Sequence, residues 1–138
     1  MIIRQFGLQP YPIIWENMKD FTNRRHSDTP DEVWLLEHLP IYTQGQAGKA
    51  EHILDAKGIP VIQTDRGGQV TYHGPGQLVA YFLFDIQRQD IGVRTLVCHL
   101  EQLLIYTLKN FSIEAHCISG APGIYVENQN SCFKNFII

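Results

Sequence analysis

The residues best suited to chemistry lie between Arg66 and Gln77, in the stretch RGGQVTYHGPGQ. Polar side chains there are interleaved with glycines, and an imidazole, His73, stands directly before Gly74. Glycine costs backbone entropy inside a strand or helix, so this density indicates special backbone angles or a close approach of the backbone to another group. Two structures fit the stretch: a glycine-rich hairpin that joins two strands, and a loop that binds a ligand.

Two common nucleotide-binding motifs do not fit this stretch. A P-loop would end in Gly-Lys-Ser or Gly-Lys-Thr, and a dinucleotide-binding fingerprint would be followed by a helix pattern, but neither feature is found here. His73 either presents its imidazole beside exposed backbone or is a hairpin histidine bonded to a neighbouring strand. A second polar stretch, TQGQAGK at residues 43–49, is either another wall of a pocket or a surface loop.

The chain has three cysteines, each of which would need a nearby cation, helix N-terminus or base to become a nucleophilic thiolate. Cys98 lies on a predicted helix, opposite its Leu/Val face, and is expected to be structural or incidental. Cys117 adjoins His116, but neighbours in a strand point to opposite faces, so these two side chains cannot meet. Cys132 lies close to Lys134 near the last residue, where little chain follows to build a pocket. None is therefore predicted to be the nucleophile.

Metal-ligand spacing is also missing. The Cys98–His99 and His116–Cys117 pairs lack the gap of two to four residues that lets ligands converge on one zinc ion, so no metal site is predicted. Carboxylates are scattered, as in the Asp31–Glu32 pair, and are expected on the solvated surface.

Hydrophobic periodicity predicts the elements that must position these residues. One helix is expected over residues 10–25, where Ile14, Trp15, Met18 and Phe21 share a face, and another over residues 93–110. The stretch 77–86 is apolar on both faces, which is typical of a central, doubly covered strand. The alternation predicts an α/β (α+β) layered domain, a mixed β-sheet covered by helices. The other expected strands are residues 2–6, 32–38, 59–64, 112–117 and 123–128, with a glycine-punctuated loop at 41–52.

The amino-acid composition limits which classes of function are possible. The 138 residues suit one domain, and 44% apolar with 18% charged residues is a globular composition. A net charge of −3 gives no basic excess for nucleic acid. No apolar run is long enough to span a bilayer, and the amino-terminal residues form no signal-peptide core. An odd number of cysteines without an export signal predicts a reduced, cytoplasmic setting.

Several blocks together identify a family resemblance. TQGQAGKAEH, IPVIQTDRGGQVTYHGPGQLV, IGVRTLV, EAH and APGIYV, in this order, closely resemble the lipoyl(octanoyl) transferases (octanoyl-acyl carrier protein:protein N-octanoyltransferases) over residues 3–126. The resemblance implies the α/β fold of the lipoate and biotin protein ligases. It also implies transfer of an octanoyl group from acyl carrier protein to a lysine of lipoyl domains, in 2-oxoacid dehydrogenases and the glycine cleavage H protein.

In that family a cysteine thiolate first takes the acyl group as a thioester, and a neighbouring lysine lowers the cysteine pKa. The resemblance implies no metal, ATP or other cofactor, because the thioester already carries the activation. The segment that lines the acyl pocket matches Arg66, Gly67, Gly68, Gln69, Val70, Thr71, Tyr72 and His73. We expect its glycines to let the backbone close on the alkyl chain, and its polar groups to hydrogen-bond the thioester carbonyl.

The resemblance ends after APGIYV. The family continues through a lysine and a Ser-Leu-Gly segment, but the lysine position falls on Asn130 and the cysteine position lies beyond Ile138. We therefore expect residues 1–127 to be the amino-terminal part of a catalytic domain, incomplete at its carboxyl end, and 128–138 to be a divergent tail. A frameshift, a premature stop or a shortened binding form would each explain this. The functions left open are octanoyl transfer, and a catalytically inactive remnant that binds acyl chains or acyl carrier protein.

Overall fold

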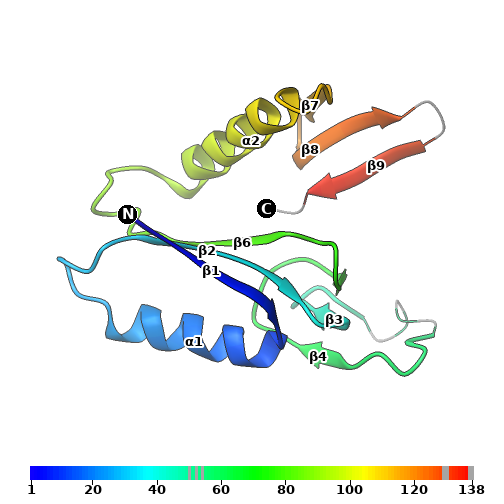
Figure 1. The fold of residues 1–138 in the computed structure, drawn as a ribbon, viewed down its shortest axis with the longest axis horizontal. Helices are drawn as coiled ribbons and strands as arrows, with labels where there is room; N and C mark the ends of the chain where they lie inside the picture. The colour runs from blue at the N-terminus through cyan, green and yellow to red at the C-terminus, as the bar shows by residue number, and fades with distance from the viewer. Residues whose placement is uncertain (50, 52, 54, 129–130, 137–138) are drawn as a thin grey trace. The chain divides into compact units, whose positions relative to one another are not determined.

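The computed structural model describes residues 1–49, 51, 53, 55–128 and 131–136 (Figure 1). The chain divides into two compact units, residues 1–84 and 85–138, and each is described by itself. No helix in the described ranges combines the length and the apolarity needed to cross a membrane.

The first unit is built on a three-stranded mixed sheet. β1 (Ile2–Gln9) runs parallel to β2 (Glu32–His38), and β2 pairs antiparallel with β6 (Val79–Leu83). Helix α1 (Tyr11–Arg24) lies along this sheet (Figure 1). The predicted strands at 2–6 and 32–38 are confirmed, and the first extends three residues further than expected.

Helix α1 forms where the spacing predicted it. Pro12 lies in its first turn, where no backbone N–H is needed for a helical hydrogen bond. Ile14 is buried and packs with Trp34 and Leu36 of β2, and Met18 and Phe21 lie against this cluster. The apolar face of the helix therefore closes one side of the sheet.

The Asp31–Glu32 pair was expected on the solvated surface, and this prediction is wrong. Both residues are buried. Arg4 donates from Nε and Nη2 to the two Glu32 carboxylate oxygens at 2.5 and 2.7 Å, and Trp34 Nε1 donates to Glu32 Oε2 at 2.7 Å. Arg25 Nη2 donates to Asp31 Oδ1 at 2.9 Å. Hydrogen bonds from these three side chains compensate the burial of both carboxylates, and the hydrogen bond from Arg4 lowers the pKa of Glu32.

A second mixed sheet of the same unit holds the polar stretches. β3 (Ile41–Gln44) lies between β4 (Val61–Gln63), to which it is parallel, and β5 (Val70–His73), to which it is antiparallel. The expected loop 41–52 therefore begins with a central strand. Its four residues alternate between buried and half-buried, a pattern too short to stand out before Gly45.

The expectation of a central strand at 77–86 is also wrong. β6 covers residues 79–83 and stands at the end of the order β1-β2-β6. Leu78, directly before it, is 71% exposed. An apolar sequence is compatible with a central or an edge position, and only the pairing partners decide between them.

The second unit holds helix α2 (Val93–Lys109) and an antiparallel sheet in the order β7-β8-β9. Its strands are β7 (Ala115–Ile118), β8 (Ala121–Asn128) and β9 (Ser131–Phe136). The helix ends one residue earlier than predicted. On its apolar face Leu100 is buried, but Val93 and Leu103 are exposed. The sequence predicted no strand for β9, and the domain division at residue 127 stays a prediction.

Candidate functional site

Two glycine-containing loops of the first unit run side by side. Three backbone N–H groups, those of Gly45, Gln46 and Ala47, donate to the carbonyls of Gln69, Arg66 and Gly68 at 2.9–3.0 Å. The stretch 43–49 and the stretch 66–77 therefore form one structure. Of the two structures that fit the stretch 66–77, the hairpin is not formed, because β5 pairs with β3 and β6 pairs with β2.

The glycines at this crossing allow close backbone contact. A Cβ atom added at Gly45 would lie 2.5 Å from the carbonyl oxygens of both Gly67 and Gly68. Gly68 has a φ of +78°, a left-handed angle that disfavours other residues. A Cβ added at Gly67 would meet no atom within 4 Å. The close approach foreseen from the sequence is therefore made, in this structure, between the two loops themselves.

Arg66 clamps this pair of loops. Its Nε and Nη2 donate to Thr43 Oγ1 at 3.2 and 2.9 Å, and Nη2 also donates to the Thr43 carbonyl at 2.6 Å. Its remaining bonds go to the carbonyls of Gln69 (2.8 Å) and Gly67 (2.9 Å). Thr43 is fully buried. The guanidinium therefore holds the loop in shape by five charge-assisted hydrogen bonds to four acceptor atoms within the fold.

A buried histidine, His38, lies at the end of β2 beside these loops. Its Nδ1 is 3.0 Å from the Gln9 carbonyl, and its Nε2 is 2.8 Å from the Tyr81 hydroxyl. A carbonyl can only accept, so Nδ1 carries the hydrogen and Nε2 accepts the bond from the Tyr81 hydroxyl. Burial lowers the pKa of His38 and raises that of Tyr81. Both shifts favour a neutral imidazole and a protonated phenol.

His73 faces His38 from β5. Their ring centroids are 5.7 Å apart, and the Tyr11 ring stacks on His73 at 5.8 Å. His73 Nδ1 donates to Gln77 Oε1 at 2.7 Å, and Nε2 lies 3.5 Å from Thr43 Oγ1 on β3, so the histidine does contact a neighbouring strand. Burial lowers the pKa of His73. Its neutral form leaves Nε2 as a proton acceptor.

Among the residues predicted to line the acyl pocket, those of β5 lie on two different faces of the strand. On β5, Thr71 pairs with Thr43 and lies on the same face as His73, whereas Tyr72 pairs with Tyr42 on the opposite face and is 45% exposed. The Tyr42 and Tyr72 rings are 5.4 Å apart. Val70 is half-buried on that second face, and Gln69 is exposed. Arg66, Thr71 and His73 thus come together around Thr43, and Tyr72 does not join them.

Three further residues belong to this site but were not identified from the sequence: Tyr11, His38 and Tyr81. The alternation of β2 held a signal for one of them, because Trp34, Leu36 and His38 occupy successive positions of one strand face. The sequence around Tyr11 and around Tyr81 gives no sign that either belongs to the site, because each contacts a histidine that is distant in the chain.

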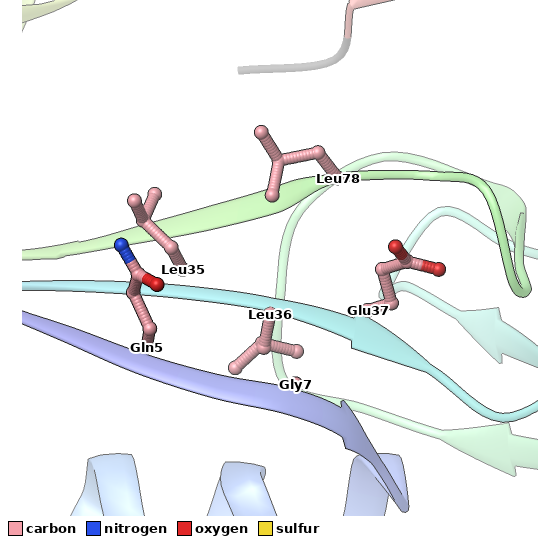
Figure 2. Close-up of a pocket in the computed structure, with 6 residues that line it drawn as sticks. All are labelled: Gln5, Gly7, Leu35, Leu36, Glu37 and Leu78. Carbon is pink, nitrogen blue, oxygen red and sulfur yellow. The ribbon is translucent and has the colours of Figure 1, made fainter.

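A hollow of about 330 Å³ lies elsewhere on the first unit (Figure 2). Apolar side chains of β2 and the residue before β6 form much of its wall. Glu37 at its edge accepts a hydrogen bond from the Gly76 N–H at 2.7 Å. The residues that line it are Gln5, Gly7, Leu35, Leu36, Glu37 and Leu78. None of the residues 66–73 lines this hollow.

Of the chemistry-bearing residues of the second unit, Cys98 and Cys117 have free, exposed thiols. Although Cys117 is exposed, partial desolvation of its thiol raises its pKa, and the neighbouring Glu101 carboxylate raises it further, which opposes thiolate formation. In the described part of the chain, no group of His, Cys, Asp and Glu is arranged to hold a metal ion. Cys132 and Lys134 belong to β9, and Asn130 lies outside the described residues.

Comparison with known proteins decides the family. Residues 14–131 match the family described as the lipoyl protein ligase A/B catalytic domain. The chain belongs to this family. An octanoyltransferase of Vibrio cholerae serotype O1 is 58% identical over 132 residues, which are 96% of this chain. One of Legionella pneumophila is 60% identical over 126 residues, or 91% of this chain. The resemblance stated from the sequence is confirmed.

The lipoyl protein ligase A/B fold is confirmed by solved structures as well. A bipartite lipoate protein ligase from Thermoplasma acidophilum superposes with a TM-score of 0.66 at 13% identity, over 90% of this chain and 50% of that chain. The chain spans 61% of the length of the Vibrio cholerae relative and 63% of that of the Legionella relative.

Proposed function

We propose that this family member serves protein lipoylation as an octanoyltransferase. The donor is octanoyl-acyl carrier protein, and the acceptors are lysines of lipoyl domains in 2-oxoacid dehydrogenases and the glycine cleavage H protein. The identity of 58–60% to proteins named octanoyltransferase supports this proposal. The proposed location is the cytoplasm, where thiols such as Cys98 and Cys117 stay reduced.

The observation that carries the proposal is the loop pair at residues 45–48 and 66–69, with neutral His73 and buried Thr43 behind it. We propose that the acyl thioester lies against residues 66–73. Arg66 is occupied by loop carbonyls and Thr43, so its part is to keep the loop shaped. A loop held by hydrogen bonds to buried groups is preorganised, which lowers the entropic cost of orienting the thioester.

In the proposed reaction, a cysteine thiolate attacks the octanoyl carbonyl. A new carbon–sulfur bond forms, and the thiolate of acyl carrier protein leaves. The acceptor lysine amine then attacks this thioester, forms the amide, and the cysteine thiolate leaves as the amine loses a proton. From the family resemblance we expect the nucleophile after Ile138 and its lysine at the position of Asn130, so residues 1–138 are proposed to supply acyl binding and orientation.

The Asn130 position favours a second candidate, an inactive chain that binds acyl groups or acyl carrier protein. One experiment separates the two. Octanoyl-acyl carrier protein and an apo lipoyl domain are incubated with residues 1–138, and in parallel with a protein that continues after Val126 with the carboxyl-terminal part of the Vibrio cholerae relative. A lipoyl domain whose acceptor lysine is replaced by arginine is the control.

We expect octanoyl-lysine, read by mass spectrometry, only with the extended protein and the unmodified lipoyl domain. Binding of an octanoyl thioester by residues 1–138, without transfer, supports the acyl-binding role of the loop pair. If the extended protein folds cooperatively and still transfers nothing, the proposed transferase function is wrong.

A further inference from the structure

Trp15 of helix α1 reaches the glycine-rich loop from outside it. Its indole Nε1 donates to Asp65 Oδ1 at 3.2 Å, although the two residues are 50 positions apart in the chain. Asp65 directly precedes Arg66, the residue that clamps the loop. A single hydrogen bond therefore connects the helix to the entrance of the segment 66–69.

Asp65 is also tied to the partner loop. Its backbone carbonyl accepts a bond from Gln46 Nε2 at 3.0 Å, and the Gln46 N–H donates to the Arg66 carbonyl at 2.9 Å. The indole bond therefore acts on a point where both loops and the helix meet. Movement of Asp65 would disturb the contact between the two loops.

Successive turns of α1 contact both ends of the site. Tyr11 stacks on His73, and Trp15, four residues later, holds Asp65. Residues at this spacing lie on the same side of a helix. Lys19, one turn further, places its Nζ 4.1 Å from the centre of the Trp15 ring and supports it by a cation–π contact.

Trp15, which was expected to share the apolar face of Ile14, is not part of the hydrophobic core cluster. The other tryptophan of the chain, Trp34, is buried and forms the core with Ile14 and Leu36. Ile14 is 2% exposed and anchors α1 to the sheet on that side. Trp15 is only half-buried and points to the loop, so its specific contribution is the N–H group given to Asp65.

We propose that Trp15 is a positioning residue for the acyl-binding loop. Its indole N–H holds Asp65, and Asp65 in turn holds residues 66–69 in the conformation that receives an octanoyl thioester. This inference rests on the proposed function of the loop, and it adds helix α1 to the parts of the fold that determine acyl affinity.

The test begins with Trp15→Phe, which keeps an aromatic ring and removes the N–H donor. We expect amide hydrogen exchange at Gly45, Gln46 and Ala47 to become about tenfold faster, because their acceptors lie in the segment released. Affinity for S-octanoyl-pantetheine is expected to fall by about the same factor. Asp65→Ala should match both effects, whereas Asp65→Asn retains an Oδ1 acceptor and should stay close to the unmodified chain.

Asp20→Asn is the matched control, since this exposed residue of the same helix forms its ion pair with Arg24, further from the loop, and not with the Lys19 that supports Trp15. The double variant Trp15→Phe/Asp65→Ala should lose no more than either single variant, as expected for two partners of one bond. Unchanged exchange at the three loop amides in Trp15→Phe, or faster exchange with unchanged octanoyl affinity, would overturn the inference. Failure of the unmodified chain to bind the octanoyl thioester would instead count against the proposed function, and the exchange result would still decide the role of Trp15 in holding the loop.

Discussion

Gly45→Ala is the sharpest test of the loop crossing. The added Cβ would lie 2.5 Å from the carbonyl oxygens of Gly67 and Gly68, and 3.0 Å from Arg66 Nη1. Two of these three neighbours are backbone oxygens: the Gly68 carbonyl accepts a hydrogen bond from Ala47 N–H, and the Gly67 carbonyl accepts one from Arg66 Nη1. They therefore cannot turn away as a flexible side chain can. One of the two loops has to move.

The structure limits how much unfolding free energy Gly45→Ala can cost. Overpacking at a tight site typically costs about 1–3 kcal/mol. The loops can instead separate, which breaks the three bonds donated by residues 45–47 at about 1 kcal/mol each. The cheaper route limits the loss of unfolding free energy to roughly 1–3 kcal/mol.

Gly67→Ala is the matched control, because a Cβ there meets no atom within 4 Å. Its expected effect is neutral or a gain of about 0.4–1 kcal/mol, from reduced freedom of the unfolded chain. Urea unfolding of both variants, followed at several wavelengths, gives the two free energies. Hydrogen exchange at residues 45–47 shows whether the loops have separated. Equal unfolding midpoints for the two variants would refute the reasoning, since the same substitution would then cost the same with and without the contact.

Three further outcomes are expected. Gly68→Val forces a β-branched residue to a φ of +78° and should weaken octanoyl thioester binding severalfold while circular dichroism stays unchanged; unaltered affinity would remove this loop from the acyl site. Tyr81→Phe removes the hydroxyl donated to His38 and should cost about 1–3 kcal/mol of unfolding free energy, measured by urea titration. Because burial lowers the pKa values of His38 and His73, the unfolded chain binds protons first as the pH falls. Stability should therefore be full above about pH 6.5 and decline as the pH falls through the lowered values, and a flat urea midpoint between about pH 7.5 and about pH 5.5 would contradict this.

The sequence alone determined the elements with long, regular patterns. The apolar spacing along α1 and α2 and the dense apolar run of β2 predicted these elements closely, because helix periodicity and strand propensity are local properties. The family was also readable, since several separated blocks agreed with one pattern in order. These features need no knowledge of which residues meet in space.

The tertiary structure decided the pairing and the site. β3 and β5 contain four residues each, too few for a periodic signal, and they exist because each completes the hydrogen bonds of the other. The need for glycine at position 45 becomes clear only in the fold, where the backbone of residues 67 and 68 lies against it. His38 gains its single tautomer from Gln9 and Tyr81, which are distant in the chain, and its lowered pKa from burial. Contacts of this kind depend on how remote segments fold together, because a hydrogen bond or a steric limit belongs to two residues and a local sequence pattern describes only one of them.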